Sequence, residues 1–74
     1  MPKFKVFSGA ELCRLLEQHD FANVRQRGSH RVMQKKTASG TVTVPVPMHS
    51  DIKIGTLLSI IRQSGVSRDQ FETG

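Results

Sequence analysis

The chain has 74 residues, a formal net charge of +5 and a single cysteine. A chain of this length buries only about 60% of the surface that it exposes when unfolded, which predicts one compact domain over residues 1–74 and excludes a large enclosed substrate cavity. The excess of Lys and Arg favours an anionic partner, and the lone cysteine excludes both an intramolecular disulfide and a cysteine-rich zinc site.

The N-terminal segment, MPKFKVF, is too short and too charged for a signal peptide, and no apolar run approaches the length of a membrane span. We therefore expect a cytoplasmic protein without membrane contact. The next residues predict a helix from about 9 to 19, because Ser8 and Glu11 have the spacing of a capping box and an apolar stripe follows them. Cys13 belongs to this stripe, so we interpret it as a small buried side chain rather than a reactive thiol.

The period of the sequence changes to two after Phe21. Residues 22–27 and 30–36 alternate on either side of Gly28-Ser29, which predicts a β-hairpin with a two-residue type II′ turn. Glycine suits the first turn position because that residue takes positive φ. The predicted cross-strand pairs are Arg27–His30, Arg25–Val32 and Val24–Met33.

A second turn is predicted at residues 37–40, followed by a third strand, TVTV, whose ladder ends at Pro45 and Pro47. An apolar helical stripe then follows, formed by Ile54, Leu57, Leu58 and Ile61, and Gly65 can end this helix in the left-handed conformation. Residues 67–70 have the spacing of a second capping box, which predicts a short helical tail. The resulting fold class is α+β, in the order α-β-β-β-α, with two helices covering one face of an antiparallel sheet and the other face open.

The open sheet face is predicted to be basic. No acidic residue occurs between Asp20 and Asp51, whereas Arg25, Arg27, Arg31, Lys35 and Lys36 all fall in that interval. Strand alternation places Arg25, Arg27, His30, Val32, Gln34 and Lys36 on the open face, and Val24, Gln26, Arg31, Met33 and Lys35 on the helix-covered face. A basic face that binds nucleic acid and one that is only solvated can have the same charge pattern, so charge alone does not distinguish between them.

His30 is the candidate catalytic residue on this face. An unperturbed imidazole titrates near ~6.5, so it can accept or donate a proton at physiological pH, and adjacent guanidinium groups can hold a phosphate. His49 follows the third strand and is a candidate second group, or simply a polar loop residue. His30, His49 and Asp51 make a poor metal-ligand set, and the GSH tip lacks the glycines and the following helix of a phosphate-binding loop; we expect neither a metal nor a cofactor.

The chain resembles the HicA family of toxin proteins, also described as YcfA-like. The resemblance lies in SGAELCRLL, FANVRQRGSHRV, TVTVPVPMH and GTLLSIIRQSGVS, which together cover nearly the whole sequence. It implies a double-stranded-RNA-binding-domain-like fold and the function of an mRNA interferase, the toxin of a type II toxin–antitoxin system that cleaves mRNA and is inhibited by a HicB-type antitoxin.

The catalytic histidine of that family corresponds to His30 through the GSH motif. The resemblance implies metal-independent endoribonuclease activity, with the RNA 2′-OH as nucleophile. We expect RNA contacts from Arg25, Arg27, Ser29, Arg31, Lys35, Lys36 and His49, directed mainly to phosphate and 2′-OH because the chain lacks Trp and Tyr. DNA is not an expected ligand of this chain alone. The alternative interpretation is a non-catalytic RNA-binding module that uses the same basic face.

Overall fold

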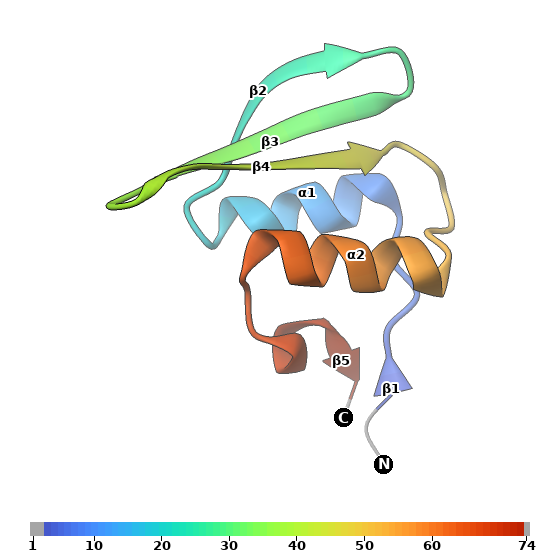
Figure 1. Cartoon of the computed structure of the whole chain (residues 1–74). Coiled ribbons are helices and arrows are strands. Elements are labelled where there is room, and N and C mark those ends of the chain that lie inside the picture. The colour runs from blue at the N-terminus through green and yellow to red at the C-terminus, as the bar shows by residue number, and fades with distance from the viewer. Residues whose placement is uncertain (1–2, 74) are drawn as a thin grey trace.

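A computed structural model describes residues 3–73; Met1, Pro2 and Gly74 of the predicted 1–74 domain lie outside the described residues. The elements confirm the predicted α+β class and its α-β-β-β-α order, with short terminal elements added (Figure 1). In chain order they are β1 (Lys3–Phe4), α1 (Gly9–Glu17), β2 (Ala22–Arg27), β3 (His30–Thr37), β4 (Gly40–Pro47), α2 (Ile54–Ser64), the 3-10 helix η1 (Arg68–Phe71) and β5 (Glu72–Thr73).

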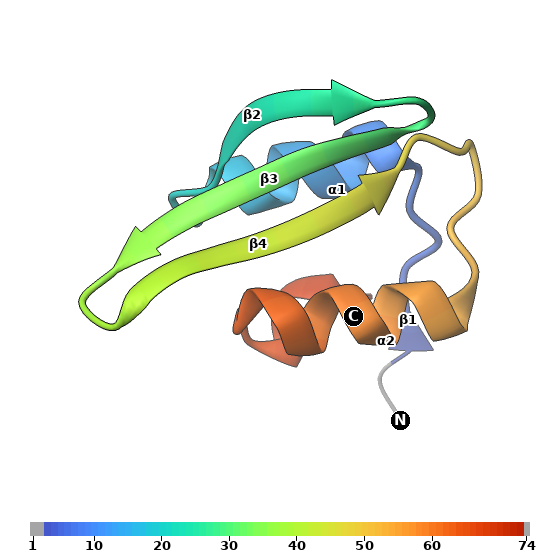
Figure 2. The same cartoon turned by 45° about the horizontal axis from the view of Figure 1, so that its top comes forward.

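The three central strands form an antiparallel sheet in the order β2-β3-β4, and both helices lie on one of its faces, as predicted (Figures 1 and 2). Met33, Val44 and Val46 point from the sheet into the core and are fully buried. Leu12 and Leu16 of α1 and Leu57, Ile60 and Ile61 of α2 meet them there. The helices therefore supply the apolar cover for one face, and the opposite face has no helix over it.

The first helix begins at the predicted capping box. The Glu11 backbone N–H donates to Ser8 Oγ at 3.1 Å, and the Ser8 N–H donates to Glu11 Oε1 at 2.9 Å. These bonds satisfy two of the backbone donors that a helix start leaves without partners. The helix ends at Glu17 with Gln18 as its C-cap, so it is shorter than the predicted range of 9–19.

The β2–β3 hairpin has the predicted two-residue loop but contains an unpredicted β-bulge. Arg27 pairs with His30 and Arg25 pairs with Val32, whereas Met33 pairs with Asn23 instead of the predicted Val24. The register shift between Asn23 and Arg25 leaves Val24 without a ladder partner, and its side chain is 48% exposed. The predicted Val24–Met33 pair is wrong because a bulge inserts one residue and breaks the alternation of faces.

The third strand extends through both prolines, which corrects the prediction that they end its ladder. Pro45 pairs with Val32 and Pro47 pairs with His30. β4 is an edge strand, so a backbone N atom on the side away from β3 has no neighbouring strand to which it could donate a hydrogen bond. Proline, which lacks the backbone N–H, is therefore tolerated at such positions. The contact continues beyond the strand, where the Met48 N–H donates to the Ser29 carbonyl at 2.7 Å.

The second helix ends at Gly65, as predicted, but presents a different face to the core. Gly65 caps it with φ of 71°, as expected, and Leu57 and Ile61 are buried. Two other members of the predicted stripe, Ile54 and Leu58, are 57% and 40% exposed. Ile60 takes their place in the core.

The terminal elements β1, η1 and β5 lie beneath the two helices, on the side away from the sheet (Figure 1). β1 pairs with β5, and the fully buried ring of Phe71 meets that of Phe7 edge to face, with 5.9 Å between centroids. The predicted second capping box is wrong: Ser67 makes no cap hydrogen bond, and its hydroxyl donates to the Asp69 carboxylate instead.

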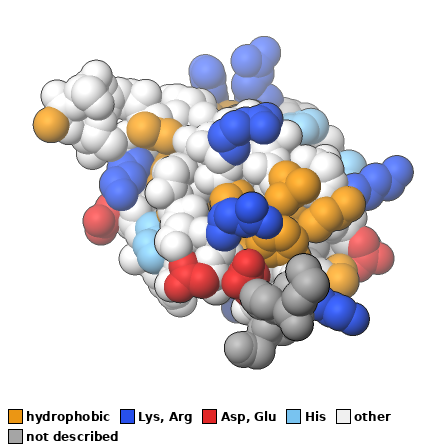
Figure 3. All heavy atoms as spheres, turned by 60° about the horizontal axis from the view of Figure 1, so that its bottom comes forward, with side chains coloured by type: hydrophobic (Ala, Val, Ile, Leu, Met, Phe, Trp, Pro, Cys, Tyr) orange, Lys and Arg blue, Asp and Glu red, His pale blue; other side chains and the backbone are white. Residues whose placement is uncertain are grey.

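Cationic side chains cover aromatic rings at this end of the molecule. Arg68 lies over the ring of Phe4 at 5.2 Å, and Lys5 lies over Phe7 at 5.4 Å. Figure 3 shows hydrophobic side chains gathered on the same side, with Lys and Arg among them. Among residues 3–73, no helix has the length and apolar character needed to cross a bilayer.

Candidate active site

The turn between β2 and β3 fixes the position of His30. Gly28 has φ of 56°, and Asp20 is the only non-glycine residue with positive φ in the described part of the chain, so Ser29 has negative φ. Positive φ at the first turn residue alone fits a type II′ turn and excludes type I′, which needs it at both. Arg27 and His30 are consequently direct cross-strand neighbours at the end of the hairpin.

The open face around His30 is hollowed, with a cavity volume of about 430 Å³. The lining combines two cations, one imidazole, one hydroxyl and apolar side chains, namely Arg25, Arg27, His30, Val32, Thr43 and Pro45. Val32 forms the floor, since it is only 6% exposed although no helix covers this face. The predicted grouping of Arg25, Arg27 and His30 on one face is therefore present in the structure.

The cations of this hollow are available for a ligand. Arg25 and Arg27 are exposed, and neither forms an ion pair with a carboxylate of residues 3–73. Guanidinium groups in this state can bind a phosphate through paired N–H donors. An exposed imidazole beside them can transfer a proton to or from a group attached to that phosphate.

The remaining predicted basic residues are divided between the two faces. Lys36 alternates onto the His30 face and pairs with Thr41, at the far end of β3. Arg31 and Lys35 face the helices, as alternation predicts. Burial raises the pKa of the Cys13 thiol, and the nearby charge of Arg31 opposes this shift without cancelling it. Lys35 Nζ lies 5.8 Å from the centre of the Phe21 ring.

Arg31 also contains a buried donor without a partner. Its Nε atom is inaccessible to solvent and makes no hydrogen bond with another described residue. Arg31 and Lys35 are each partly exposed, so their charges contribute to the field of the molecule without entering the His30 hollow.

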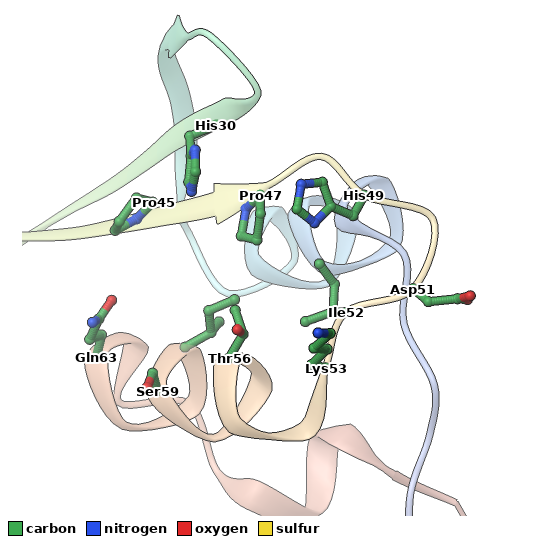
Figure 4. A pocket seen from close by; sticks show the side chains of 11 residues that line it. His30, Pro45, Pro47, His49, Asp51, Ile52, Lys53, Thr56, Ser59 and Gln63 are labelled. Atoms are coloured by element: carbon green, nitrogen blue, oxygen red, sulfur yellow. The ribbon is translucent and has the colours of Figure 1, made fainter.

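His49 is held close to the same site by the start of α1. The Gly9 N–H donates to the His49 carbonyl at 2.9 Å. A Cβ atom at position 9 would lie 2.3 Å from the Pro47 carbonyl oxygen, so only glycine permits this approach. His30 and His49 thereby line one groove, and both side chains lie at its upper rim in Figure 4.

Several residues that surround His30 were not expected from the sequence. Thr43 and Pro45 come from β4, and the groove shared with His49 is bordered by Thr56, Ser59 and Gln63 of α2. The spacing of these three polar residues, at i, i+3 and i+7, places them on one helix face and was the available sequence signal. In residues 3–73 no group of three or more His, Cys, Asp or Glu side chains is arranged to hold a metal ion.

Comparison with known proteins identifies the family. A search of curated proteins found no match to the chain. The family model described as "HicA toxin of bacterial toxin-antitoxin" matches residues 9–66, which extend from the start of α1 to just after α2. This span includes the hairpin, both histidines of the groove and the polar face of α2. The chain therefore belongs to the HicA family of toxins of bacterial toxin–antitoxin systems.

Proposed function

We propose that this toxin is an endoribonuclease that binds and cleaves mRNA, with His30 as its catalytic residue. The observation that carries the proposal is the grouping of His30 with Arg25 and Arg27 in one solvent-open hollow. A shallow basic hollow suits a polymer better than an enclosed small molecule, and phosphates are the groups on RNA that guanidinium recognises.

The proposed reaction uses the substrate's own nucleophile. The RNA 2′-OH attacks the adjacent phosphorus, so that the O2′–P bond forms while the P–O5′ bond breaks. The 2′ proton passes to a base, and the departing O5′ takes a proton from an acid. In the proposed mechanism side chains carry out both proton transfers and stabilise the phosphoryl charge, so it uses no metal ion. Arg25 and Arg27 offset the charge that develops on the phosphoryl oxygens.

His30 supplies one of these proton transfers, and His49 is the closest candidate for the other because it borders the same groove. If both act, the rate shows a bell-shaped dependence on pH, and His49→Ala removes one limb of the bell. If His30 acts alone as base, the rate rises with pH to a plateau, and His49→Ala leaves that shape unchanged.

The partners follow from the site and the family. Ser29 and Lys36 extend the contact surface along the hairpin, and His49 adds a contact from the adjoining groove. Arg31 and Lys35, which face the helices, add their charge to the field that attracts RNA. Family membership implies an antitoxin, and we propose that it is a HicB-type protein that covers the basic face. Its substrate would place the toxin in the cytoplasm.

Purified protein tests the proposal with three variants. His30→Ala abolishes cleavage of a single-stranded RNA while its affinity for that RNA changes little. Arg27→Ala weakens binding and reduces the slope of log affinity against log salt by about 0.7 to 1, because one phosphate contact is lost. Arg62→Ala removes the same charge from an exposed position on α2 that lines neither hollow, and it leaves the slope unchanged.

A non-catalytic RNA-binding module gives a different result. In that case the wild type binds RNA with the same salt dependence, but wild type and His30→Ala give identical RNA products. An RNA with a single 2′-deoxy substitution provides the chemical control: cleavage is lost at the substituted position and persists elsewhere. Persistence at the substituted position contradicts the proposed nucleophile.

A further inference from the structure

A second hollow adjoins the basic one and lies between the end of β4 and α2, with a volume of about 440 Å³. Figure 2 shows α2 running beside the outer edge of β4. His30 and Pro45 line both hollows, so the two join at the candidate catalytic histidine. A polymer that crosses His30 from the arginines would enter this groove next.

One wall of the groove is a row of neutral polar side chains. Thr56, Ser59 and Gln63 project from α2 toward β4, facing His30 and Pro45 across the groove (Figure 4). None of the three side chains hydrogen-bonds to another described residue, so their donors and acceptors are available to a ligand. Each of them can both donate and accept.

The electrostatic character of the groove differs from that of the basic hollow. Lys53 and Asp51 bring opposite charges to one end, and the Asp51 carboxylate points away from the groove in Figure 4. No arginine lines it, whereas two line the other hollow. Neutral hydroxyl and amide groups match the edges of bases and the ribose 2′-OH better than they match phosphates.

We propose that this groove binds the nucleotide on the side of the scissile phosphate opposite the arginines, and that Thr56, Ser59 and Gln63 set the sequence preference of cleavage. This inference rests on the proposed ribonuclease function and adds a specificity subsite to it. The volume lies within the range of about 300–1,000 Å³ typical of ligand sites, which suits one base with its ribose. The arginines hold the backbone, and the groove selects the base.

The test maps every cut site of the wild type, Gln63→Ala and the triple variant Thr56→Ala/Ser59→Ala/Gln63→Ala on one mixed-sequence RNA. We expect a broader distribution of cut sites, and a fall in kcat/KM at the preferred site of about two- to tenfold per side chain, the factor for one neutral hydrogen bond. The salt dependence of RNA binding stays at the wild-type slope, unlike that of Arg27→Ala. Gln70→Ala, an exposed glutamine in η1, makes the same chemical change outside the groove and keeps the wild-type pattern.

The outcomes separate this inference from the proposed function. His30-dependent cleavage with an unchanged cut-site distribution in the triple variant overturns the groove assignment alone. Cleavage that does not depend on His30 overturns both. Unchanged cleavage combined with weaker antitoxin binding would identify the groove as a protein contact and also overturn the assignment. Thermal unfolding of each variant shows whether it is folded, so that a change in the cut-site distribution is not mistaken for a loss of structure.

Discussion

The close approach of Gly9 to the end of β4 gives a sharp structural prediction. In Gly9→Ala, the new Cβ would lie 2.3 Å from the Pro47 carbonyl oxygen and 2.8 Å from the Met48 Cα. The first distance is about 0.7 Å short of the 3.0 Å that real Cβ contacts keep. Both neighbours are backbone atoms, so the clash cannot be relieved by rotating a side chain.

The expected cost follows from the atoms that must move. Overpacking costs about 1–3 kcal/mol, and losing the hydrogen bond from Gly9 to the His49 carbonyl adds about 0.5–1.5 kcal/mol. The higher helix propensity of alanine offsets part of this loss, because it stabilises a helix by about 0.5–1 kcal/mol relative to glycine. Together these contributions lower the free energy of unfolding by about 0.5–4 kcal/mol, which in a domain of this size lowers Tm by roughly 2–30 °C.

Urea and thermal unfolding of Gly9→Ala and Gly55→Ala provide the assay. Gly55 lies in the first turn of α2, and a Cβ added there would have nothing within 4 Å, so alanine at this position should keep or slightly raise stability. If Gly9→Ala unfolds at the same urea concentration as Gly55→Ala, the packing of α1 against Pro47 is wrong. The clash would also displace His49 from the groove. If His49 supplies the second proton transfer, the rate of RNA cleavage by Gly9→Ala should fall further than its loss of stability explains.

The remaining predictions concern the helix caps and the thiol. Ser8→Ala should lower the free energy of unfolding by about 1 kcal/mol in urea titrations, because the capping box is lost. The backbone N–H of Ser8 lowers the pKa of Glu11, so wild type should lose stability as the pH falls through that lowered pKa, and Glu11→Gln should lose less over the same range. Burial raises the pKa of Cys13, so the stabilisation is present below the pKa of the unfolded thiol and is lost above it: wild type should weaken more than Cys13→Ala in alkali, and a thiol reagent should label Cys13 only after unfolding. Gly65→Ala should destabilise the protein by about 1 kcal/mol, measured by thermal unfolding, because φ is 71° there.

Local signals predicted much of the fold and the grouping of Arg25, Arg27 and His30 in the candidate site. A two-residue loop fixes the register next to it, so the Arg27–His30 and Arg25–Val32 pairs followed from Gly28-Ser29 alone. The capping box of α1 and the glycine that ends α2 could likewise be predicted from neighbouring residues. Each of these features depends on residues only a few positions apart.

The features that the sequence did not reveal depend on tertiary position. Pro45 and Pro47 continue a strand because β4 lies at the sheet edge, and edge position is a property of the assembled sheet. The bulge at Val24 interrupts an alternation that looked regular. Ile60, rather than Leu58, faces the core because of how α2 packs against β4.

His49 illustrates the same limit for the candidate site. Its backbone carbonyl accepts a hydrogen bond from the Gly9 N–H, forty residues earlier in the chain, and this contact holds it near His30. The polar face of α2 has a recognisable spacing, but only the packing of α2 along β4 turns that spacing into the wall of a groove. Sequence therefore identified the chemical groups of the hairpin, and the fold added the groups that surround them.

Paired induction of wild type and His30→Ala in a bacterium, with growth and full-length mRNA followed together, tests the role of His30 in RNA cleavage. We expect growth arrest with loss of transcripts in the wild type, and continued growth with intact transcripts in an equally folded His30→Ala. Arrest and transcript loss in both strains, or intact transcripts in both, would contradict the role assigned to His30.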